Sequence, residues 1–545
     1  MPAREMRWWG WGEDGQGGPA PAHAVAWLEA QLGAPLGPET PPVALEDVRL
    51  PRTRLRRRAA EALRAIVGED GVREDRAARV VHAAGKGYPD LVRLRAGEAR
   101  PAPDAVVLPA SAGQVGALLG ACALAGVAVV PFGGGTSVVG GVEPLRGPHH
   151  AVIALDLARL TRMRRLDERS RLASFEPGLR GPEVEHLLRA RGLTLGHFPQ
   201  SFEYSTVGGW VATRSAGQAS TGYGRIDELV AGLTLTAPAG EVALAPHPAS
   251  AAGPDLRELI VGSEGALGVL TEMTLEVQPR PAAGSYEGWM LPSFEAGTEA
   301  LREMAQSGAT ADVVRLSDER ETGMSLALSG LTGARAALTG SYLRARHVAG
   351  GALAIVGWEG DADAVLRRRR ATRAVLARHG GAALGPSAGR AWARGRFHAP
   401  YLRDELLGRG VLVETLETAG TWSGLERLYR AVRAALEAHA PFVACHVSHV
   451  YPSGASLYFT FLAPMERERP LAQWTAIKRA ACEAIVDAGG TITHHHGIGR
   501  DHAAYLAAED GEQGVAALRA LKAQLDPAGI MNPGKLVTSS GRPSR

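Results

Sequence analysis

The sequence predicts an α+β protein with two main domains and a helical segment at each end. Its 545 residues are too many for one hydrophobic core. Short apolar strands alternate with glycine clusters over 101–280, and with long Ala/Arg helices over 281–500. Residues 1–100 have helical spacing and few β-branched runs. We therefore expect a helical N-terminal region (1–100), a ligand-binding domain (101–280), a second domain (281–500) and a C-terminal segment (501–545).

The composition is that of a globular protein. Apolar residues make up 45% and charged residues 21%, which excludes a disordered or collagenous chain. With 60 basic and 57 acidic residues the formal charge is +3, which argues against nucleic acid as an obligate partner. The three cysteines, Cys122, Cys445 and Cys482, form no CxxC pair, so neither a disulfide framework nor a zinc site is indicated.

One uncharged run, Val115–Phe132, is long enough to suggest a membrane span. It is rich in glycine and alanine, and Gly126 divides it into a helix and a strand, so we expect no span. The N-terminus lacks the apolar stretch of a signal peptide, and the C-terminus carries no peroxisomal signal. We expect a cytoplasmic protein whose last residues, SSGRPSR, are disordered.

The expected elements follow one another in chain order. In the first domain a helix is expected at 111–125, and five strands at 105–109, 127–132, 151–157, 233–238 and 271–277. In the second domain we expect strands at 352–360 and 456–461 and a long helix at 361–381. A helix from 501 then leads into the tail LDPAGIMNPGKL, which spans 525–536.

A glycine-rich loop, Pro131–Ser137, follows the expected strand at 127–132. Three consecutive glycines let the backbone approach a ligand and turn successive N–H groups toward an anion. The loop is neither a Walker A motif, which ends in G-K-[ST], nor a dinucleotide fingerprint, which needs a third glycine at Val138. A tight turn without a ligand is the alternative.

Three further segments add hydroxyls and small residues beside backbone N–H groups, which suits a pyrophosphate and a flat ring system. They are Gln200–Thr206, Thr213–Gly217 and Val261–Leu270. Together with the glycine loop they resemble the FAD-binding domain of the vanillyl-alcohol oxidase / p-cresol methylhydroxylase (PCMH-type) superfamily. The resemblance implies a flavoprotein in which an α+β FAD-binding domain carries an α+β substrate (cap) domain, and a C-terminal segment that returns to the FAD domain.

Some members of that superfamily attach FAD through a histidine near the glycine loop. Here no histidine lies between Pro131 and Gly147, so we expect non-covalent FAD. The resemblance also implies that Gly134 leaves room for the pyrophosphate, so that a branched side chain there would exclude the cofactor.

Three adjacent histidines, His494, His495 and His496, form the most unusual segment. Flanking glycines suggest a short strand that enters a loop, with His494 and His496 on one face and His495 on the other. A metal site, a solvent-exposed tract and a catalytic or substrate-polarising cluster are the three interpretations. We expect no metal, because no cysteine or carboxylate lies close by in sequence.

The strand at 456–461 alternates, which places Leu457, Phe459 and Phe461 on one face and Tyr458 on the other. A tyrosine on a strand is usually structural, but its phenol moves a proton where a cation or a flavin lowers its pKa. His446 and His449 could join such a site, although isolated histidines are more often structural.

Two arginines are candidates for anion binding. Arg315 lies in an apolar context, so its charge needs a buried partner, either an acidic side chain or an anionic ligand. Arg403 precedes Asp404, which could pair with it, but arginine is also the natural bidentate holder of a phosphate or carboxylate.

Five segments together resemble the alkyldihydroxyacetonephosphate synthase (alkylglycerone-phosphate synthase) family over nearly the whole chain. They are Trp8–Gly12, the PYLRD and ETLET segments, the LYFTF strand and the HHHGIG turn. The resemblance implies exchange of the acyl group of acyl-dihydroxyacetone phosphate for a long-chain alcohol. It also implies that flavin N5 holds dihydroxyacetone phosphate covalently, with no net redox change.

The family's functional residues fall on matching positions of this sequence. The resemblance assigns acid/base catalysis to Tyr458, an essential histidine run to His494, His495 and His496, an activity-linked arginine to Arg315 and substrate binding to Arg403. It assigns FAD contact to Pro131, Phe132, Gly133, Gly134, Gly135, Thr136, Ser137, Gln200, Ser201, Phe202, Glu203, Tyr204, Ser205, Thr206, Thr213, Arg214, Ser215, Ala216, Glu264, Gly265, Ala266, Leu267, Gly268, Val269 and Leu270.

Two other interpretations stay open. The NPGK tail also occurs in flavin-dependent 2-hydroxyacid (D-lactate or glycolate type) dehydrogenases and oxidases, which would make the reaction redox. A non-enzymatic flavin-binding scaffold would use the arginine runs Arg52–Arg58 and Arg367–Arg370 at a surface. Such runs are usually solvated helix faces, although in a lipid enzyme they could contact an anionic membrane peripherally. A homodimer is compatible with the sequence.

Overall fold

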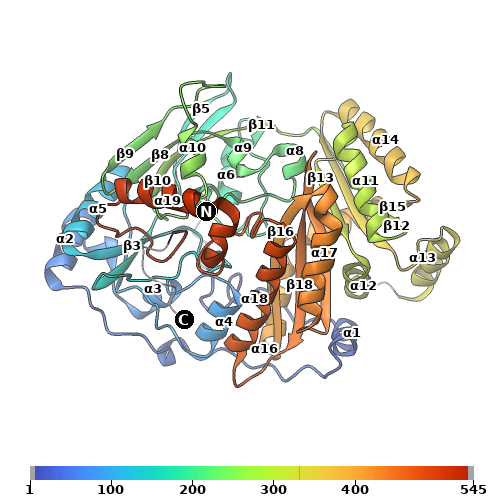
Figure 1. The fold of residues 1–545 in the computed structure, drawn as a ribbon, viewed down its shortest axis with the longest axis horizontal. Coiled ribbons are helices and arrows are strands. Elements are labelled where there is room, and N and C mark those ends of the chain that lie inside the picture. Colours follow the sequence, from blue (N-terminus) through green and yellow to red (C-terminus); the bar gives the residue numbers. More distant parts are fainter. Residues whose placement is uncertain (1–5, 331, 538–545) are drawn as a thin grey trace.

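The computed structural model describes residues 6–330 and 332–537, and the expected disorder of SSGRPSR lies outside this part. Two units stand side by side (Figure 1). One carries a four-stranded and a five-stranded sheet, and the other a single seven-stranded sheet. The expected mixed α+β fold is confirmed. The expected domain boundaries at 100, 280 and 500 stay a prediction.

The four-stranded sheet has the order β1-β2-β4-β3 and is parallel except for β1. Its strands are β1 (Val72–Arg73), β2 (Ala105–Val107), β3 (Val127–Phe132) and β4 (Ala151–Asp156). The middle strands read as continuous apolar runs because a covered parallel sheet is buried on both faces. Helices α2 (Arg57–Val67) and α5 (Ala112–Ala125) belong to the same hydrophobic core as this sheet.

The five-stranded sheet is antiparallel, with the order β5-β6-β10-β8-β9. Its strands are β5 (Met163–Asp167), β6 (Leu172–Phe175), β8 (Val230–Ala237), β9 (Gly240–Leu244) and β10 (Val269–Glu276). The nearby helices are α6 (Gly181–Arg189), α7 (Val207–Thr213), α8 (Ser220–Tyr223), α9 (Ile226–Leu229) and α10 (Leu256–Ile260). Strands β7 (Leu193–Thr194) and β11 (Gln278–Pro279) form a separate pair.

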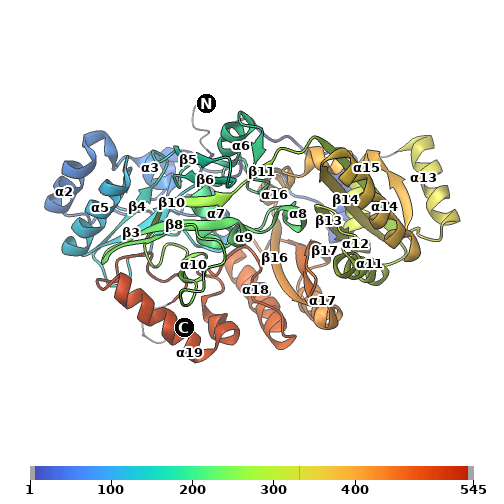
Figure 2. The same cartoon turned by 90° about the horizontal axis from the view of Figure 1, so that it is seen from above.

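The seven-stranded sheet is antiparallel, with the order β15-β12-β14-β13-β17-β18-β16. From above, it lies beside the unit that carries the other two sheets (Figure 2). Its strands are β12 (Ala283–Leu291), β13 (Val313–Ser317), β14 (Ala352–Gly360), β15 (Ala382–Gly385), β16 (Val411–Thr421), β17 (Phe442–Val450) and β18 (Gly454–Pro464). Helices α11 (Phe294–Ser307), α14 (Ala362–Arg378), α17 (Trp422–Glu437) and α18 (Pro470–Asp487) share one hydrophobic core with it. Shorter helices are α12 (Glu319–Leu328), α13 (Gly333–Ala345), α15 (Pro386–Gly395) and α16 (Ala399–Gly408).

Strand β18 shows the alternation that the sequence predicts. Leu457, Phe459 and Phe461 are fully buried in the core shared with α17 and α18, whereas Tyr458 is only half-buried. Successive side chains of a strand point to opposite faces, so Tyr458 lies on the face of the sheet away from these helices.

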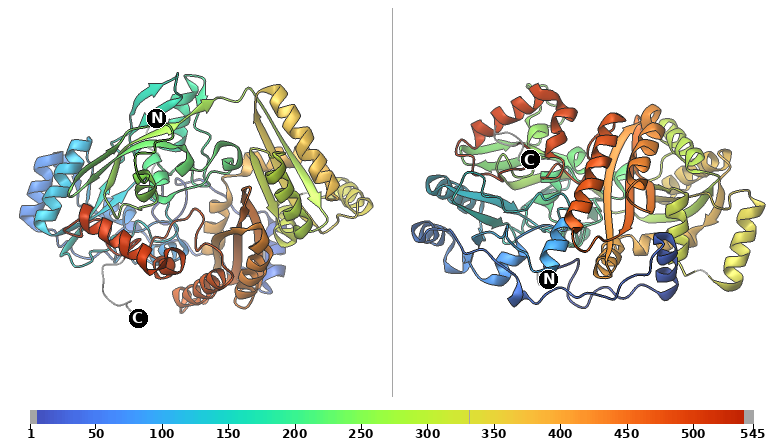
Figure 3. Two further views of the ribbon diagram at one scale, coloured as in Figure 1. Left: turned by 45° about the horizontal axis from the view of Figure 1, so that its top comes forward. Right: turned by 60° about the horizontal axis from the view of Figure 1, so that its bottom comes forward.

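The two ends of the chain tie the units together. After α1 (Ala22–Leu32), which packs against the seven-stranded sheet, an extended segment runs beneath both units (Figure 3). It leads into α2, α3 (Arg76–Val81) and α4 (Tyr88–Arg95). At the other end, α19 (Leu506–Leu525) is followed by a tail that pairs with β3, Met531 bridging Val129. The tail therefore returns to the first unit.

The uncharged run 115–132 divides as expected, into most of α5 and then β3. Among the described residues, no helix combines the length and the apolar character needed to cross a bilayer.

Candidate active site

Four segments expected to contact the cofactor converge in the first unit. Residues 131–137 leave the carboxyl end of β3, 200–206 lead into α7, 213–216 leave it, and 264–270 enter β10. The contacts between them are close, because a side chain added at Gly134 would meet the carbonyl oxygen of Tyr204, and one at Gly265 would meet Pro131. The N–H of Glu264 donates to the carbonyl of Ala212 at 2.8 Å. The structure thus brings these four segments together.

The glycine loop offers unused donors. Within the described ranges, no side chain or carbonyl accepts a hydrogen bond from the backbone N–H groups of residues 133–138. Gly135 is buried and the other residues of 133–138 are half-buried. A row of donors without a protein acceptor after a strand suits an anionic ligand. Gly135 has a φ of 65° and Gly265 one of 74°, conformations that favour glycine. These features fit the pyrophosphate of FAD.

Unmatched buried atoms also gather around the second segment. Gln200 Nε2, His197 Nδ1 and Ser220 Oγ are buried and have no hydrogen-bond partner among the described residues. His197 Nε2 hydrogen bonds to Ser215 Oγ at 2.8 Å, so only Nδ1 of this imidazole lacks a partner among the described residues. Orphaned polar atoms of this kind mark places where a ligand or water completes the structure.

The guanidinium of Arg214 is bound by other residues of the first unit. Arg214 ends α7 in a left-handed conformation with φ of 52°, while its guanidinium is bound to Glu258 and to the carbonyl of Val261. Its assigned cofactor contact stays a prediction. His149, one of the two histidines nearest the loop in sequence, hydrogen bonds instead to the carbonyl of Gly529 at 2.9 Å.

In the second unit, three polar side chains form a row across the face of the sheet that lies away from α17 and α18. His446 on β17 pairs with Tyr458 on β18, which pairs with Glu417 on β16. Directly paired residues share a face and lie close together. The rings of His446 and Tyr458 stack with centroids 4.8 Å apart. Glu417 was not assigned a role from the sequence, although it lies in the ETLET segment.

A β-bulge adds His449 to the same face. Val447 pairs with Leu457, but His449 pairs with the next residue, Ser456, so Ser448 is an extra residue on β17. Without the bulge, residues three apart on a strand would face opposite sides. His449 Nδ1 lies 3.2 Å from Ser456 Oγ, and its Nε2 lies 3.1 Å from the carbonyl of Gly217 in the first unit.

Arg315 has the buried acidic partner that its apolar setting requires. Its guanidinium binds Glu321 on α12 and lies 3.1 Å from His446 Nδ1, which is itself 2.9 Å from Glu321. Burial alone would raise the pKa of the Glu321 carboxyl, but His446 and Arg315 lower it to about 2. The arginine therefore adds positive charge beside the His446–Tyr458 pair without an unpaired buried ion.

The histidine run does not form the short strand expected from the sequence. It is a bend, and neighbouring rings meet in succession, with centroids 5.2 Å apart for His494–His495 and 4.7 Å for His495–His496. The cause is Glu417, whose carboxylate accepts hydrogen bonds from the N–H groups of all three histidines. Successive N–H groups of an extended strand point to opposite sides, so one carboxylate cannot reach three of them there.

The bend places the imidazole rings beside Tyr458 and beside His449. His495 and His496 lie 6.1 and 5.7 Å from the Tyr458 ring, centroid to centroid. The His494 ring lies 4.8 Å from that of His449. A chain of hydrogen bonds runs from His495 Nδ1 to His494 Nδ1 at 3.0 Å and from His494 Nε2 to the hydroxyl of Tyr451 at 2.7 Å.

Burial sets the protonation of this cluster at neutral pH. It raises the pKa of Tyr458 to about 12, and a hydrogen bond to Thr415 and the charge of Arg315 offset it only in part. Burial also lowers the pKa of His494 and His495 to about 3, and that of His496 below its ordinary value. At pH 7 the phenol is therefore protonated and the imidazoles are neutral.

Three of these imidazoles, from His449, His494 and His495, lie close enough to hold a metal ion. Hydrogen bonds to Ser456, Gly217, Tyr451 and the neighbouring imidazole already involve both nitrogens of His449 and His494. We therefore interpret the cluster as a hydrogen-bonded network.

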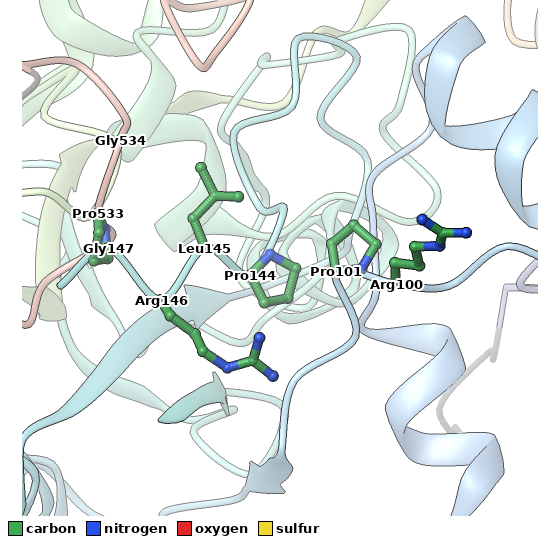
Figure 4. A pocket seen from close by; sticks show the side chains of 8 residues that line it. All are labelled: Arg100, Pro101, Pro144, Leu145, Arg146, Gly147, Pro533 and Gly534. Atoms are coloured by element: carbon green, nitrogen blue, oxygen red, sulfur yellow. The ribbon is translucent and has the colours of Figure 1, made fainter. Parts of the chain in front are cut away.

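An open cavity lies elsewhere. It has a volume of about 500 Å³ and is lined by residues from three parts of the chain: Arg100, Pro101, Pro144, Leu145, Arg146, Gly147, Pro533 and Gly534 (Figure 4). None of these residues is among the expected site residues.

Arg403 lies on α16 and is held by the protein itself. Its Nε and Nη2 both donate to Asp404 Oδ1, at 3.1 and 2.8 Å, and its Nη1 donates to the carbonyl of Lys86 at 2.8 Å. No described contact joins it to the Tyr458 cluster, so its role in binding a substrate phosphate stays a prediction.

If Arg403 binds a phosphate, Arg403→Lys should raise KM for the phosphorylated substrate about tenfold or more, because an ammonium cannot reproduce the planar fork. Arg162→Lys is a matched control, since Arg162 also places Nε and Nη2 on one carboxylate oxygen, that of Glu176. Steady-state kinetics on both variants decide. The expected tenfold rise in KM corresponds to about 1.4 kcal/mol. If KM of Arg403→Lys rises by less than about threefold, the arginine serves its pairing with Asp404 instead.

Two family models match the chain in succession. The FAD binding domain matches residues 103–244, and the C-terminal domain of FAD linked oxidases matches residues 280–536. The first match covers the glycine loop and the segments around α7. The second covers the sheet that carries Tyr458 as well as the histidine run.

Three similar proteins that are 30–32% identical over 92–98% of this chain share one name. Alkyldihydroxyacetonephosphate synthase of Trypanosoma brucei brucei is 32% identical, covering 98% of this chain and 93% of its own. That of Dictyostelium discoideum is also 32% identical, covering 92% of this chain and 84% of its own. A solved alkyldihydroxyacetonephosphate synthase structure superposes with a TM-score of 0.84 at 28% identity, covering 97% of this chain and 99% of that one.

Proposed function

The chain belongs to the alkyldihydroxyacetonephosphate synthase family, and on that premise we propose that it is an FAD-dependent transferase of ether lipid biosynthesis. It exchanges the acyl group of acyl-dihydroxyacetone phosphate for a long-chain alcohol, with no net redox change. The observation that carries the proposal is the position of Tyr458, whose phenol lies on the sheet face away from α17 and α18, among His446, His495 and His496.

The exchange needs a proton to leave the carbon that bears the acyloxy group and later to return. A phenol with a pKa of about 12 cannot take a proton at pH 7 unless it gives up its own. The imidazoles beside it are neutral, and because burial lowers their pKa, an imidazolium forms there only while the substrate carries the matching negative charge. We infer that the Tyr458 proton passes to the histidine run as the phenol oxygen takes the substrate proton, and that both transfers reverse when the alcohol has replaced the carboxylate.

The FAD is held by residues of the first unit. The unmatched N–H groups of 133–138 suit its pyrophosphate, and the orphaned Gln200 Nε2 offers one further donor. When bound, FAD supplies an electrophilic ring system that retains the dihydroxyacetone phosphate part while the two long chains exchange. His449 and Gly217 join the two units by a hydrogen bond, so the flavin domain and the Tyr458 face meet at this place.

The alternative, oxidation of a 2-hydroxyacid, differs in its need for an electron acceptor. We expect the protein to turn over palmitoyl-dihydroxyacetone phosphate and hexadecanol anaerobically, releasing palmitate without bleaching the flavin. Anaerobic stopped-flow absorbance follows flavin bleaching with this substrate pair and, separately, with D-lactate. Palmitate release is measured in the same samples. Flavin bleaching by D-lactate, with no release of palmitate, would establish the dehydrogenase alternative instead.

We also infer a peripheral contact with an anionic surface. Arg52, Arg54, Arg56 and Arg58 are exposed within one short segment, and clustered arginines are attracted to anionic lipid. The run Arg367–Arg370 supports such a contact less, because Arg368 and Arg369 are paired with Asp312 and Glu287.

A further inference from the structure

The Glu417 carboxylate makes an unusual set of contacts. Its side chain is fully buried, and it accepts hydrogen bonds from the hydroxyl of Thr493 at 2.7 Å and from the N–H groups of His495 and His496 at 3.1 and 2.9 Å. The N–H of His494 donates to its other oxygen. All four donors belong to consecutive residues, so a single side chain fixes the backbone of the whole histidine run.

A second carboxylate holds the end of the same loop. Glu264, from the first unit, accepts hydrogen bonds from the N–H groups of Ile498 at 2.5 Å and Gly499 at 2.7 Å. The loop is therefore held by hydrogen bonds to carboxylates of both units, Glu417 beside Tyr458 and Glu264 beside the glycine loop. Removing either carboxylate would shift the imidazoles relative to the groups they face.

An ionised carboxylate is the side chain best suited to this task. It is acceptor-only, with room for about four hydrogen bonds on two oxygens, and bonds to a charged acceptor are the strong ones. Burial opposes ionisation of Glu417, yet the neighbouring histidines and Thr493 hold its pKa well below the usual range. A glutamine of the same shape would turn an NH₂ group toward one of the backbone donors and lose that bond.

We propose that Glu417 is a positioning residue, which holds the bend of the histidine run and so places the imidazoles of His495 and His496 beside Tyr458. This inference rests on the proposed function, because it gives the histidine run its part in moving the substrate proton. Glu417 binds the backbone N–H groups of the run, and its oxygens also lie 3.8 Å from His495 Nδ1 and 3.6 Å from His496 Nδ1. It acts on the reaction through the run.

The chain contains a matched control for Glu417. Glu185 is also buried and also accepts a hydroxyl and backbone N–H groups, from Thr194 at 2.8 Å, Leu195 at 3.0 Å and Gly196 at 3.3 Å. It lies on α6 of the first unit and has no contact with the histidine run. Glu417→Gln and Glu185→Gln therefore remove the same kind of interaction from two different loops.

The experiment compares the FAD-loaded wild type with both glutamine variants by hydrogen–deuterium exchange, melting temperature, flavin content and steady-state kinetics. Glu417→Gln should speed exchange in the segment 491–499 about tenfold or more, because hydrogen bonds to a charged acceptor are lost. It should lower kcat about 100-fold, the scale of a misplacement of about 1 Å, and leave KM within about threefold. Glu185→Gln should speed exchange only around 194–196 and keep kcat.

A second variant covers the case in which Glu417→Gln does not fold. Glu417→Asp keeps the charge but withdraws it by one methylene group, and should give a smaller exchange effect in the same segment with a smaller loss of kcat. Unchanged exchange at 491–499 in both Glu417 variants would overturn the proposal, as would an equal loss of kcat in Glu185→Gln.

The failure of the inference and that of the proposed function are distinguishable. If the wild type oxidises a 2-hydroxyacid instead of exchanging an acyl group for an alcohol, the proposed function fails. In that case kcat for the oxidation is compared between the wild type and the glutamine variants. The exchange measurement needs no substrate and still decides whether Glu417 holds the run. A kcat within about threefold of wild type in Glu417→Gln, for whichever reaction occurs, would contradict a positioning role.

Discussion

Gly134→Val is expected to give a folded protein without FAD. A Cβ at this position would lie 2.0 Å from the carbonyl oxygen of Tyr204 and 2.9 Å from the Cα of Ser205, both backbone atoms. No side-chain rotation relieves such a conflict, so the glycine loop and the segment 200–206 must separate. The two segments jointly form the cofactor site, so their separation removes the row of N–H donors from the pyrophosphate.

This reason differs from the one expected from sequence. From the sequence, the added side chain is expected to fill space that the pyrophosphate needs. In the structure, the added Cβ instead clashes first with the backbone of Tyr204 and Ser205. The expected outcome is the same, but the structure predicts that Gly134→Ala would already disturb the site, since the clash involves the Cβ alone.

Flavin absorbance after acid precipitation measures the effect. Wild-type protein should release its FAD into the supernatant, and flavin retained in the pellet would contradict non-covalent binding. Gly120→Val is the control, because a Cβ at Gly120 on α5 meets no atom within 4 Å. Gly134→Val protein that keeps a full complement of FAD would show that the loop tolerates the displacement.

The sequence predicted much of the regular structure, for a physical reason. Apart from the short strand expected at the histidine run, each expected strand and helix corresponds to an element of the structure, because long apolar runs and alternating patterns report burial directly. The alternation in β18 placed Tyr458 on the face opposite Phe459. The apolar context of Arg315 correctly required a buried partner, although only the fold identified it as Glu321, six residues away on α12.

What the sequence could not predict depends on register and on long-range backbone contacts. The bulge at Ser448 brings His449 to the face of the sheet that carries His446. No local residue pattern predicts such an extra residue in a strand. The bend of the histidine run is imposed by Glu417, some 77 residues earlier in the chain. The flanking glycines suggested a strand entering a loop, and the distant carboxylate overrides that local tendency.

Tyr458→Phe is the second large effect, and it tests the chemistry itself. The substitution removes one oxygen and leaves the ring that stacks on His446, with centroids 4.8 Å apart. Packing, FAD content and melting temperature should therefore stay near wild type. Loss of a general acid/base is expected to lower kcat by about 10² to 10⁴.

Tyr429→Phe is the matched control for loss of a phenol. Its hydroxyl donates to Asp318 at 3.1 Å, and its ring stacks against Phe459 on the helix-covered face of the sheet. We expect this control to lose stability but to keep kcat, since the phenol lies away from the Tyr458 face. Measuring turnover and flavin spectrum in the same samples separates the two effects.

The pattern of results then identifies the proton carrier. A Tyr458→Phe protein that keeps both its FAD and wild-type turnover would exclude the phenol from the reaction, leaving the imidazoles around it, those of His446, His495 and His496, as candidates for taking the proton. Loss of FAD in that variant would make Tyr458 structural. In that case a chelator added to the wild type would test whether His449, His494 and His495 hold a metal ion.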